Sequence, residues 1–294
     1  MSSSGGAAAR GASSDGAVGR RSVASLQAAR DAGERFTVLT AYDRATAELA
    51  EAADIPALLV GDSLAQVALG LESTVRVGMP EMLHHVAAVV RSSRRALVIA
   101  DMPFLSYVDS ATAAKNAGAF IRDAGAGAVK LEGGREVAPI IQSLVTSGVP
   151  VVGHIGFTPQ SSLHQERARA QGKEPAAAAR LLADALALQA AGAAAIVIEL
   201  VPSELATLIT ARLTIPTIGI GAGAGCSGQV QVAPDLLALL ASTAPRHAGR
   251  YATLRDVAIA GLVKWRSDVA AGHFPTAAQS VATSDELHAA LATL

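Results

Sequence analysis

Short apolar runs alternate along the chain with longer alanine-rich segments in which apolar residues recur at helical spacing. The runs predict strands at Phe36–Ala41, Ala57–Gly61, Ala96–Ala100, Ala128–Leu131, Pro150–His154, Ala195–Glu199, Thr217–Ile220 and, more weakly, Gln229–Val232. The segments between them predict helices that include Arg44–Ala53, Pro80–Ser92, Ser110–Ala124, Val137–Ser147, Ala176–Ala191 and Pro202–Arg212. Continuous apolar strands that alternate with helices indicate a parallel sheet covered on both faces.

About eight such units suit a single-domain (β/α)8 TIM barrel, which we expect over residues 22–294. A doubly wound open sheet is the alternative, but its dinucleotide-binding form would carry GxGxxG after the first strand. Here "TAYDRA" (Thr40–Ala45) follows that strand. The glycine-rich run "GIGAGAGCSG" (Gly219–Gly228) comes after the seventh strand. Barrels often bind an anion there, although a tight connection between the last two strands explains the glycines equally well.

Residues 1–21 are rich in serine, glycine and alanine and lack apolar periodicity. This composition predicts a disordered tail, because too few apolar groups are available to form a core. Arginine and serine with few acids also describe an organelle transit peptide, but the segment shows no clear amphipathic helix.

The overall composition narrows the classes of partner. A formal net charge of -1, without a basic stripe or interleaved aromatics, argues against nucleic acid. The single cysteine, Cys226, excludes a disulfide or a cysteine-based metal site within one chain and favours a reducing, cytoplasmic setting. No apolar run reaches the roughly 18 residues needed to span a bilayer, so we expect no membrane partner.

Ionisable residues stand at or just beyond the carboxyl ends of five successive predicted strands. In a barrel these ends meet at one mouth, where active sites are built. A single such residue is commonly a turn cap, but five strands in succession predict a shared site. Its members, in chain order, are Asp62, Asp101, Lys130, Glu132, His154 and Glu199.

Three of these residues, Asp62, Asp101 and Glu132, predict a metal site. Crowded and buried carboxylates raise one another's pKa, and a divalent cation relieves that cost. Oxygen ligands without cysteine or paired histidine favour Mg²⁺ over Zn²⁺. A 2-keto acid, which offers a carboxylate and a keto oxygen, would suit such an ion.

The remaining ionisable residues suggest proton chemistry. Lys130 and Glu132 lie two apart on one strand and therefore point the same way. Lys130 would reach into the mouth, or would simply pair with a neighbouring acid. Glu199 is placed to act as a base that removes a proton beside a carbonyl and leaves an enolate. His154 would orient its neighbours by hydrogen bonding, or would be an ordinary buried histidine.

The sequence resembles the ketopantoate hydroxymethyltransferase family over nearly the whole predicted barrel. The matching stretches occur in order and are "LTAYD" (Leu39–Asp43), "LLVGDSL" (Leu58–Leu64), "ADMPF.SY" (Ala100–Tyr107), "AVKLEGG" (Ala128–Gly134), "GHIGFTPQS" (Gly153–Ser161), "IELVP" (Ile198–Pro202) and "IPTIGIGAG" (Ile215–Gly223).

The resemblance implies a homo-oligomeric barrel, usually a decamer. It implies transfer of a one-carbon unit from 5,10-methylenetetrahydrofolate to 3-methyl-2-oxobutanoate, which gives 2-dehydropantoate for pantothenate and coenzyme A. By motif matching, Glu199 would take the C3 proton, and the metal would be held directly or through water. The residues matched to the metal are Asp62, Asp101 and Glu132, and those matched or expected at the keto acid are Asp62, Ser63, Asp101, Lys130 and His154.

Two loops depart from the family pattern. "SLHQERARAQGK" (Ser162–Lys173) lacks the paired glycines usual after "TPQS", and "CSGQVQVAPD" (Cys226–Asp235) has Ser227 where an acid is common. These changes leave open a paralogue that acts on another keto acid. Another metal-dependent barrel, of the phosphoenolpyruvate mutase and isocitrate lyase type, would commonly carry a cysteine in its catalytic loop. A non-catalytic assembly subunit would be expected to lose the acids, which are all present here.

Overall fold

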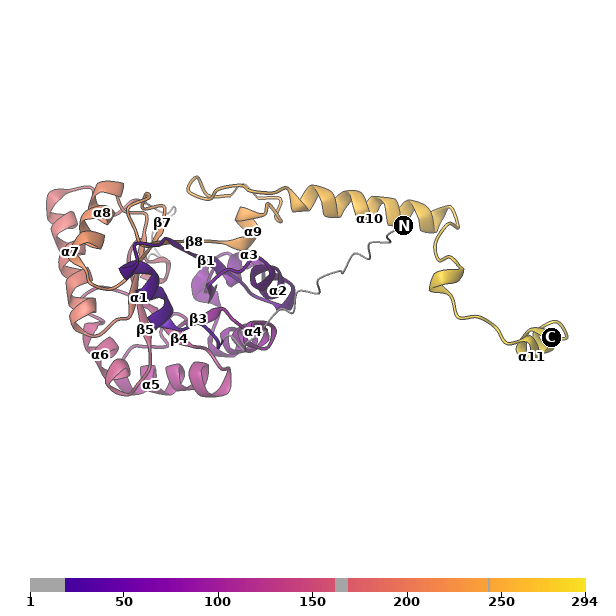
Figure 1. The fold of residues 1–294 in the computed structure, drawn as a ribbon, viewed down its shortest axis with the longest axis horizontal. Coiled ribbons are helices and arrows are strands. Elements are labelled where there is room, and N and C mark those ends of the chain that lie inside the picture. The colour runs from indigo at the N-terminus through magenta and orange to yellow at the C-terminus, as the bar shows by residue number, and fades with distance from the viewer. Residues whose placement is uncertain (1–18, 162–168, 243) are drawn as a thin grey trace, which may run out of the picture. The chain divides into compact units, whose positions relative to one another are not determined.

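The computed structural model describes residues 19–161, 169–242 and 244–294 (Figure 1). The chain divides into two compact units, Met1–Ala233 and Pro234–Leu294. All the strands that the structure describes belong to the first unit, which therefore contains the predicted catalytic residues. The expected boundaries at residues 21 and 22 stay predictions.

Eight parallel strands close into a barrel, in which β8 pairs with β1. Their order around the barrel follows the chain, so each strand lies beside its sequence neighbours. The (β/α)8 prediction is confirmed, and the open-sheet alternative is wrong. The strands are β1 (Phe36–Thr40), β2 (Ala57–Val60), β3 (Leu97–Asp101), β4 (Ala128–Glu132), β5 (Val151–Gly156), β6 (Ala195–Glu199), β7 (Thr217–Ile220) and β8 (Gly228–Gln231).

Helices follow most of the strands, close to their predicted bounds. The predicted helix Ser110–Ala124 ends earlier than expected, because its last turns widen into a π-helical segment at Ala119–Asp123. Helix α1 is not among the helices predicted from the sequence. The helices of the first unit are α1 (Val23–Asp31), α2 (Arg44–Ala52), α3 (Leu64–Val67), α4 (Met79–Ser92), α5 (Ser110–Gly118), α6 (Ala138–Thr146), α7 (Pro175–Ala190) and α8 (Ser203–Arg212).

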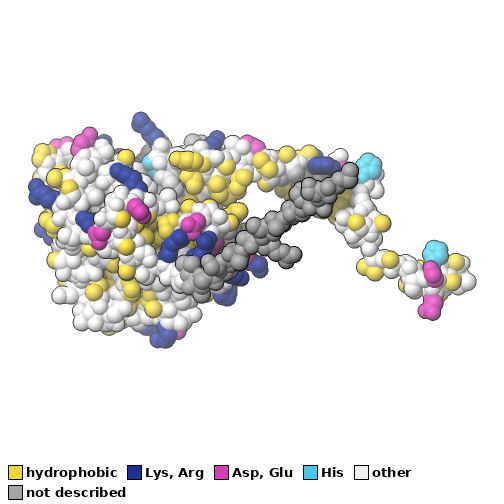
Figure 2. Space-filling model, in the orientation of Figure 1, with side chains coloured by type: hydrophobic (Ala, Val, Ile, Leu, Met, Phe, Trp, Pro, Cys, Tyr) yellow, Lys and Arg dark blue, Asp and Glu magenta, His cyan; other side chains and the backbone are white. Residues whose placement is uncertain are grey.

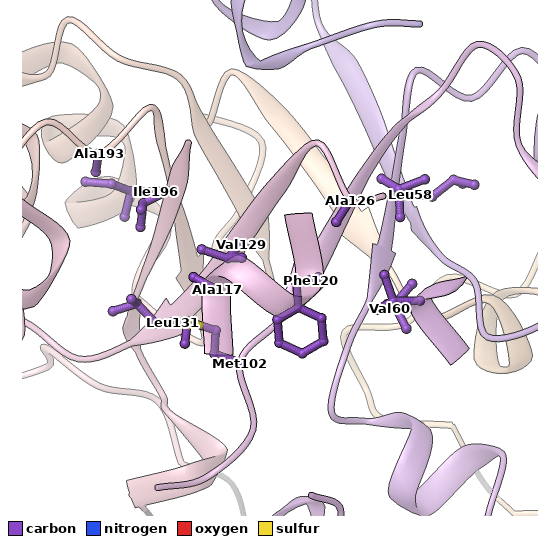
Figure 3. Packing of buried hydrophobic residues seen from close by; sticks show 14 of the residues in the cluster. Leu58, Val60, Met102, Ala117, Phe120, Ala126, Val129, Leu131, Ala193 and Ile196 are labelled. Atoms are coloured by element: carbon purple, nitrogen blue, oxygen red, sulfur yellow. The ribbon is translucent and has the colours of Figure 1, made fainter. Parts of the chain in front are cut away.

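In most strands alternate residues enter two separate apolar clusters, because successive side chains of a strand point to opposite faces. On β4, Val129 and Leu131 join the outer cluster between strands and helices, where Phe120 is fully buried (Figure 3). Ala128 belongs to the inner cluster. A ring of eight inner residues, one from each strand, surrounds a void of about 10 Å³: Val38, Leu59, Ile99, Lys130, Val152, Val197, Ile218 and Val230. The barrel interior is therefore packed. An active site is expected at the carboxyl ends of the strands, which we call the upper end or mouth of the barrel.

The second unit contains α9 (Ala233–Leu236, which begins at the boundary), α10 (Leu254–Ala270) and α11 (Asp285–Leu291). No residue of α10 is buried, and most of its large apolar side chains, among them Leu262 and Trp265, are exposed. Figure 2 shows hydrophobic side chains in yellow along this segment. Among the residues that the structure describes, no helix is both long and apolar enough to cross a membrane.

The predicted tail lies almost wholly outside the described residues, which begin at Gly19. Its last two residues contact the barrel unit. The Arg20 side chain donates to the carbonyl of Val90, and Arg21 pairs with Asp54 at 3.0 Å. The altered loop after β5 is described only for its final residues, since 162–168 lie outside the described ranges.

Candidate active site

Strand register places the ionisable residues inside the barrel. Asp101 ends β3 two positions after the interior residue Ile99, and Glu199 ends β6 two positions after the interior residue Val197. On β4 the inward positions carry Lys130 and then Glu132. Their side chains therefore continue the inner face of the barrel at its carboxyl end.

Lys130 lies between two carboxylates. Its Nζ is 2.8 Å from Asp101 Oδ1 and 3.5 Å from Glu132 Oε1, and all three residues are buried. Burial alone would lower the pKa of Lys130, but the charges of Asp101, Glu132 and Asp62 raise it above its usual value. Lys130 therefore both reaches the mouth and pairs with a neighbouring acid, so the two alternatives drawn from the sequence are compatible.

His154 connects the lysine cluster to Glu199. Its Nδ1 lies 3.2 Å from both Glu132 Oε1 and Lys130 Nζ, and its Nε2 lies 3.3 Å from Glu199 Oε2. Burial and Lys130 act to lower its pKa, but Glu132 and Glu199 outweigh them and raise it to about 9. His154 is thus a buried link between two carboxylates.

Asp62 reaches the same cluster from a different backbone position. It lies two residues beyond β2, where its backbone N–H donates to Asp101 Oδ2 at 3.1 Å. Burial, followed by the charges of Asp101 and Glu132, raises the pKa of Asp62 to about 8. Burial also raises the pKa of Asp101, although Lys130 opposes it. The cluster therefore carries more carboxylates than its own cations can neutralise.

Ser63 is next to Asp62 but bonds elsewhere. Its Oγ is 2.8 Å from the hydroxyl of Tyr42. Tyr42 belongs to the stretch "LTAYD", and its backbone carbonyl contacts the ring of His85 at 2.6 Å. The structure joins the other six predicted residues directly, whereas Ser63 stands at the edge of their network.

Two further residues of the network, Gln160 and Tyr107, lie within the family motifs but were not predicted as site residues from the sequence. Gln160 bonds to Asp62, and its backbone N–H donates to Glu132 Oε2 at 3.0 Å. The Tyr107 hydroxyl donates to Gln160 Oε1 at 2.6 Å, and burial raises its pKa. The polar ends of "ADMPF.SY" and "GHIGFTPQS" were the available signal, but spacing alone could not bring the two loops together.

Backbone geometry fixes the place of Glu199. Gly156, the last residue of β5, has φ +96°, and a Cβ there would lie 2.2 Å from the Glu199 carbonyl oxygen. The next residue's N–H, that of Phe157, donates to the same oxygen at 2.9 Å. Leu200 adopts φ +48°, so the chain turns sharply after β6. Only glycine allows the two strand ends to approach this closely.

The donor set at Asp62 and Asp101 fits a hard divalent cation. Asp101 Oδ1 and His154 Nε2 are buried and make no hydrogen bond of good geometry, although Lys130 Nζ lies 2.8 Å from the first and Glu199 Oε2 lies 3.3 Å from the second. Both oxygens of Glu132, in contrast, are engaged by His154 and Gln160. Among the described residues, no group of three His, Cys, Asp or Glu side chains is arranged to hold a metal. The three-acid Mg²⁺ site therefore stays a prediction, with Asp62 and Asp101 as its better-placed members.

The glycine-rich run connects β7 to β8. A Cβ at Gly223 would lie 2.4 Å from the Cβ of Ser203, and one at Gly225 would lie 2.0 Å from Thr207 Oγ1, so these glycines allow close packing on α8. The Arg35 guanidinium donates to the carbonyls of Ala224 and Cys226. These contacts explain the glycines as a tight connection.

The sequence decides the family. Residues 20–277 match the family model described as ketopantoate hydroxymethyltransferase. The chain belongs to this family. Its relatives include a 3-methyl-2-oxobutanoate hydroxymethyltransferase from Chloroflexus aurantiacus, which is 56% identical over 87% of this chain and 91% of its own. Another protein of that name, from Gluconacetobacter diazotrophicus, is 51% identical over 90% of this chain and 96% of its own.

Similar solved structures agree on the fold. A phosphonopyruvate hydrolase in complex with oxalate and Mg²⁺ is 16% identical, covers 93% of this chain and 96% of its own, and gives a TM-score of 0.58. A 2,3-dimethylmalate lyase of the phosphoenolpyruvate mutase and isocitrate lyase superfamily gives 0.53 at 16% identity, over 90% of this chain and 92% of its own. At this identity the likeness concerns the barrel alone. Family membership confirms the enzyme class inferred from the motifs, a hydroxymethyltransferase.

Proposed function

We propose that this hydroxymethyltransferase makes 2-dehydropantoate from 3-methyl-2-oxobutanoate, with 5,10-methylenetetrahydrofolate as the one-carbon donor. The observation that carries the proposal is the continuous chain of buried polar contacts from Asp62 and Asp101 through Lys130 and His154 to Glu199. This chain would join a site for an anionic, chelating substrate to a carboxylate base. The names of the relatives and the family motifs supply the identities of substrate and donor.

The keto acid would bind against Asp62, Ser63, Asp101 and Lys130. The ammonium of Lys130 would face the developing oxyanion, and its raised pKa keeps it charged throughout the physiological range. Its aliphatic stem stands in the apolar ring below, which excludes water from that side. His154 would hold Glu199 in place while the substrate is bound.

Mg²⁺, held by Asp62 and Asp101 with Glu132 acting through water, would make the C–H bond next to the keto group more acidic. This assignment follows the contacts of each acid. Glu132 already accepts hydrogen bonds on both oxygens, whereas Asp101 Oδ1 has only its ion pair with Lys130.

Glu199 would remove the C3 proton, and the electron pair of the broken C–H bond would form the enolate. The enolate carbon would then attack the methylene carbon of the folate iminium, which forms the new C–C bond. Cleavage of the remaining C–N bond and addition of water would release tetrahydrofolate and the hydroxymethyl product. Glu199, 16% exposed, is the member of the network with access to the mouth.

Assembly as a homo-oligomer, a decamer by family resemblance, belongs to the same proposal, as does a cytoplasmic location. Neither nucleic acid nor a membrane has a role in it. The pathway served would be that of pantothenate and coenzyme A.

An NMR assay in D2O tests the proposal. Enzyme, Mg²⁺ and 3-methyl-2-oxobutanoate are incubated with and without 5,10-methylenetetrahydrofolate. We expect loss of the C3 proton signal in both samples and 2-dehydropantoate only with the folate. Exchange without product would show that the base and metal site work on this keto acid but that another acceptor is used. Absence of exchange in both samples would contradict the proposed substrate and favour a paralogue that acts on a different keto acid.

A further inference from the structure

Gln160 is a neutral side chain in the middle of a charged cluster. It lies in the 3₁₀ turn Pro159–Ser161 that follows β5, and it is 2% exposed. A buried amide is costly unless its donors and acceptor are all bonded. The bonds that Gln160 forms therefore indicate what it does.

Every polar group of the Gln160 side chain has a partner. Nε2 donates to Asp62 Oδ2 and to the carbonyl of Met102, both at 3.0 Å. Oε1 accepts from the Tyr107 hydroxyl at 2.6 Å. The Tyr107 oxygen accepts in turn from the backbone N–H of Glu132 at 3.4 Å, so its proton is directed to Gln160. This order of donors fixes which end of the amide faces Asp62.

The backbone of Gln160 makes a second link. Its N–H donates to Glu132 Oε2 at 3.0 Å. One residue therefore holds one oxygen of the acid that follows β2 and one oxygen of the acid that ends β4. The two carboxylates repel each other, and Glu132 is among the groups that raise the pKa of Asp62.

We propose that Gln160 is a positioning residue that sets Asp62 and Glu132 in the orientation needed for binding of the keto acid. The inference rests on the proposed function. The side-chain amide fixes the direction of Asp62 without adding a charge that would compete with a bound cation, and the backbone N–H does the same for Glu132. Residues that support ligands in this way commonly contribute 10–100-fold, as an order of magnitude, to metal affinity or activity.

The Gln160→Glu variant tests the donor specifically. It keeps the shape of the side chain and the acceptor for Tyr107, but it places an oxygen where Nε2 now donates to Asp62. Gln27→Glu is the matched control. Gln27 Nε2 also donates to a carboxylate and a carbonyl, Asp31 Oδ1 at 2.8 Å and Thr214 O at 3.0 Å, but it lies on α1, before the first strand.

Binding of 3-methyl-2-oxobutanoate in the presence of Mg²⁺ is measured by calorimetry, and KM, kcat and melting temperature are measured alongside it. We expect Gln160→Glu to weaken binding and raise KM by about 10–100-fold, with a smaller change in kcat. Gln27→Glu should keep wild-type affinity. If Gln160→Glu does not fold, Tyr107→Phe serves, because loss of its hydroxyl frees Oε1 and should weaken binding several-fold.

Wild-type affinity in Gln160→Glu or, where that variant does not fold, in Tyr107→Phe would overturn the inference, as would an equal loss in the Gln27 control. A lower melting temperature with unchanged KM would show that Gln160 contributes to stability alone. If the wild-type protein fails to bind the keto acid, the proposed function is wrong and the assigned role of Gln160 falls with it. Failure in the variant comparison alone leaves the proposed function intact.

Discussion

The lower and upper ends of the barrel interior use the same strands for opposite purposes. Ile99 and Val197 lie in the ring that packs the interior, whereas Asp101 and Glu199, two residues further along the same strands, lie in the polar mouth. Two residues advance a strand by only about 7 Å. The side chains at both positions point to the inside of the barrel. Their position along the strand therefore decides whether they pack in the core or line the polar mouth.

Lys130 is the exception, because it belongs to both ends. It takes the place of an aliphatic residue in the ring, yet its Nζ contacts Asp101 and Glu132 above. A substitution of Lys130 should therefore have the largest effect, because it changes both the packed ring and the polar mouth.

Lys130→Met keeps a long apolar stem but removes the charge. We expect a loss of about 3–5 kcal/mol in the free energy of unfolding near neutral pH, because buried carboxylates lose their cation. The loss should shrink as the pH is lowered, since protonated acids no longer repel one another. Urea unfolding from pH 5 to pH 8 measures both effects. A loss that does not vary with pH would indicate a packing defect.

Glu199→Gln should preserve the fold and keto acid binding but reduce turnover by about 10²–10⁴, the usual contribution of a general base. The side chain keeps its shape and its place beside His154, so only the proton acceptor is lost. Deuterium exchange at C3 reports the defect directly. Exchange at the wild-type rate would remove Glu199 from the role of base.

Asp62→Asn should stabilise the chelator-treated protein above pH 8. The folded-state pKa of Asp62, about 8, lies above the ordinary aspartate pKa of 3.8, so the wild-type protein loses stability as the pH rises from about 4 to 8. Each unit of pKa difference corresponds to about 1.4 kcal/mol, so we expect a gain of at least about 2 kcal/mol. Thermal unfolding in EDTA at pH 9 measures it. Added Mg²⁺ should stabilise the wild type more than the variant, because ligands stabilise the state that binds them. Equal stability of the two proteins in EDTA would contradict crowding at Asp62.

Ile99→Val should have the smallest effect, a loss of about 0.5–1.5 kcal/mol from one missing methyl group in the ring. Because the substitution leaves every polar contact of the mouth in place, KM should stay at the wild-type value. Urea unfolding together with steady-state kinetics separates the two quantities. A clear rise in KM would show that the packed ring and the mouth are coupled.

The alternation of apolar strands and helices was sufficient to predict the barrel, and β6 and β7 begin and end where their apolar runs do. Helix α10 was not predicted in the same way. No face of it is buried, so its apolar residues do not form the one-sided pattern that marks a core-facing helix. The ionisable residues at strand ends were predictable because strand register is a local property. Gln160 was not, since its partners are brought to it by two loops whose paths depend on the whole barrel.

The packing of the barrel also shapes its electrostatics. The ring of aliphatic side chains below Lys130 leaves a void of about 10 Å³, too little space for water to collect there. Solvent therefore cannot screen the charges of the mouth from beneath, and a wall of low dielectric constant directs their field toward the open end. An arriving ligand meets nearly the full potential of the cluster. The packed interior of the barrel thus acts as a low-dielectric region beneath the site, which lets a few buried charges attract or repel a ligand before it reaches the mouth.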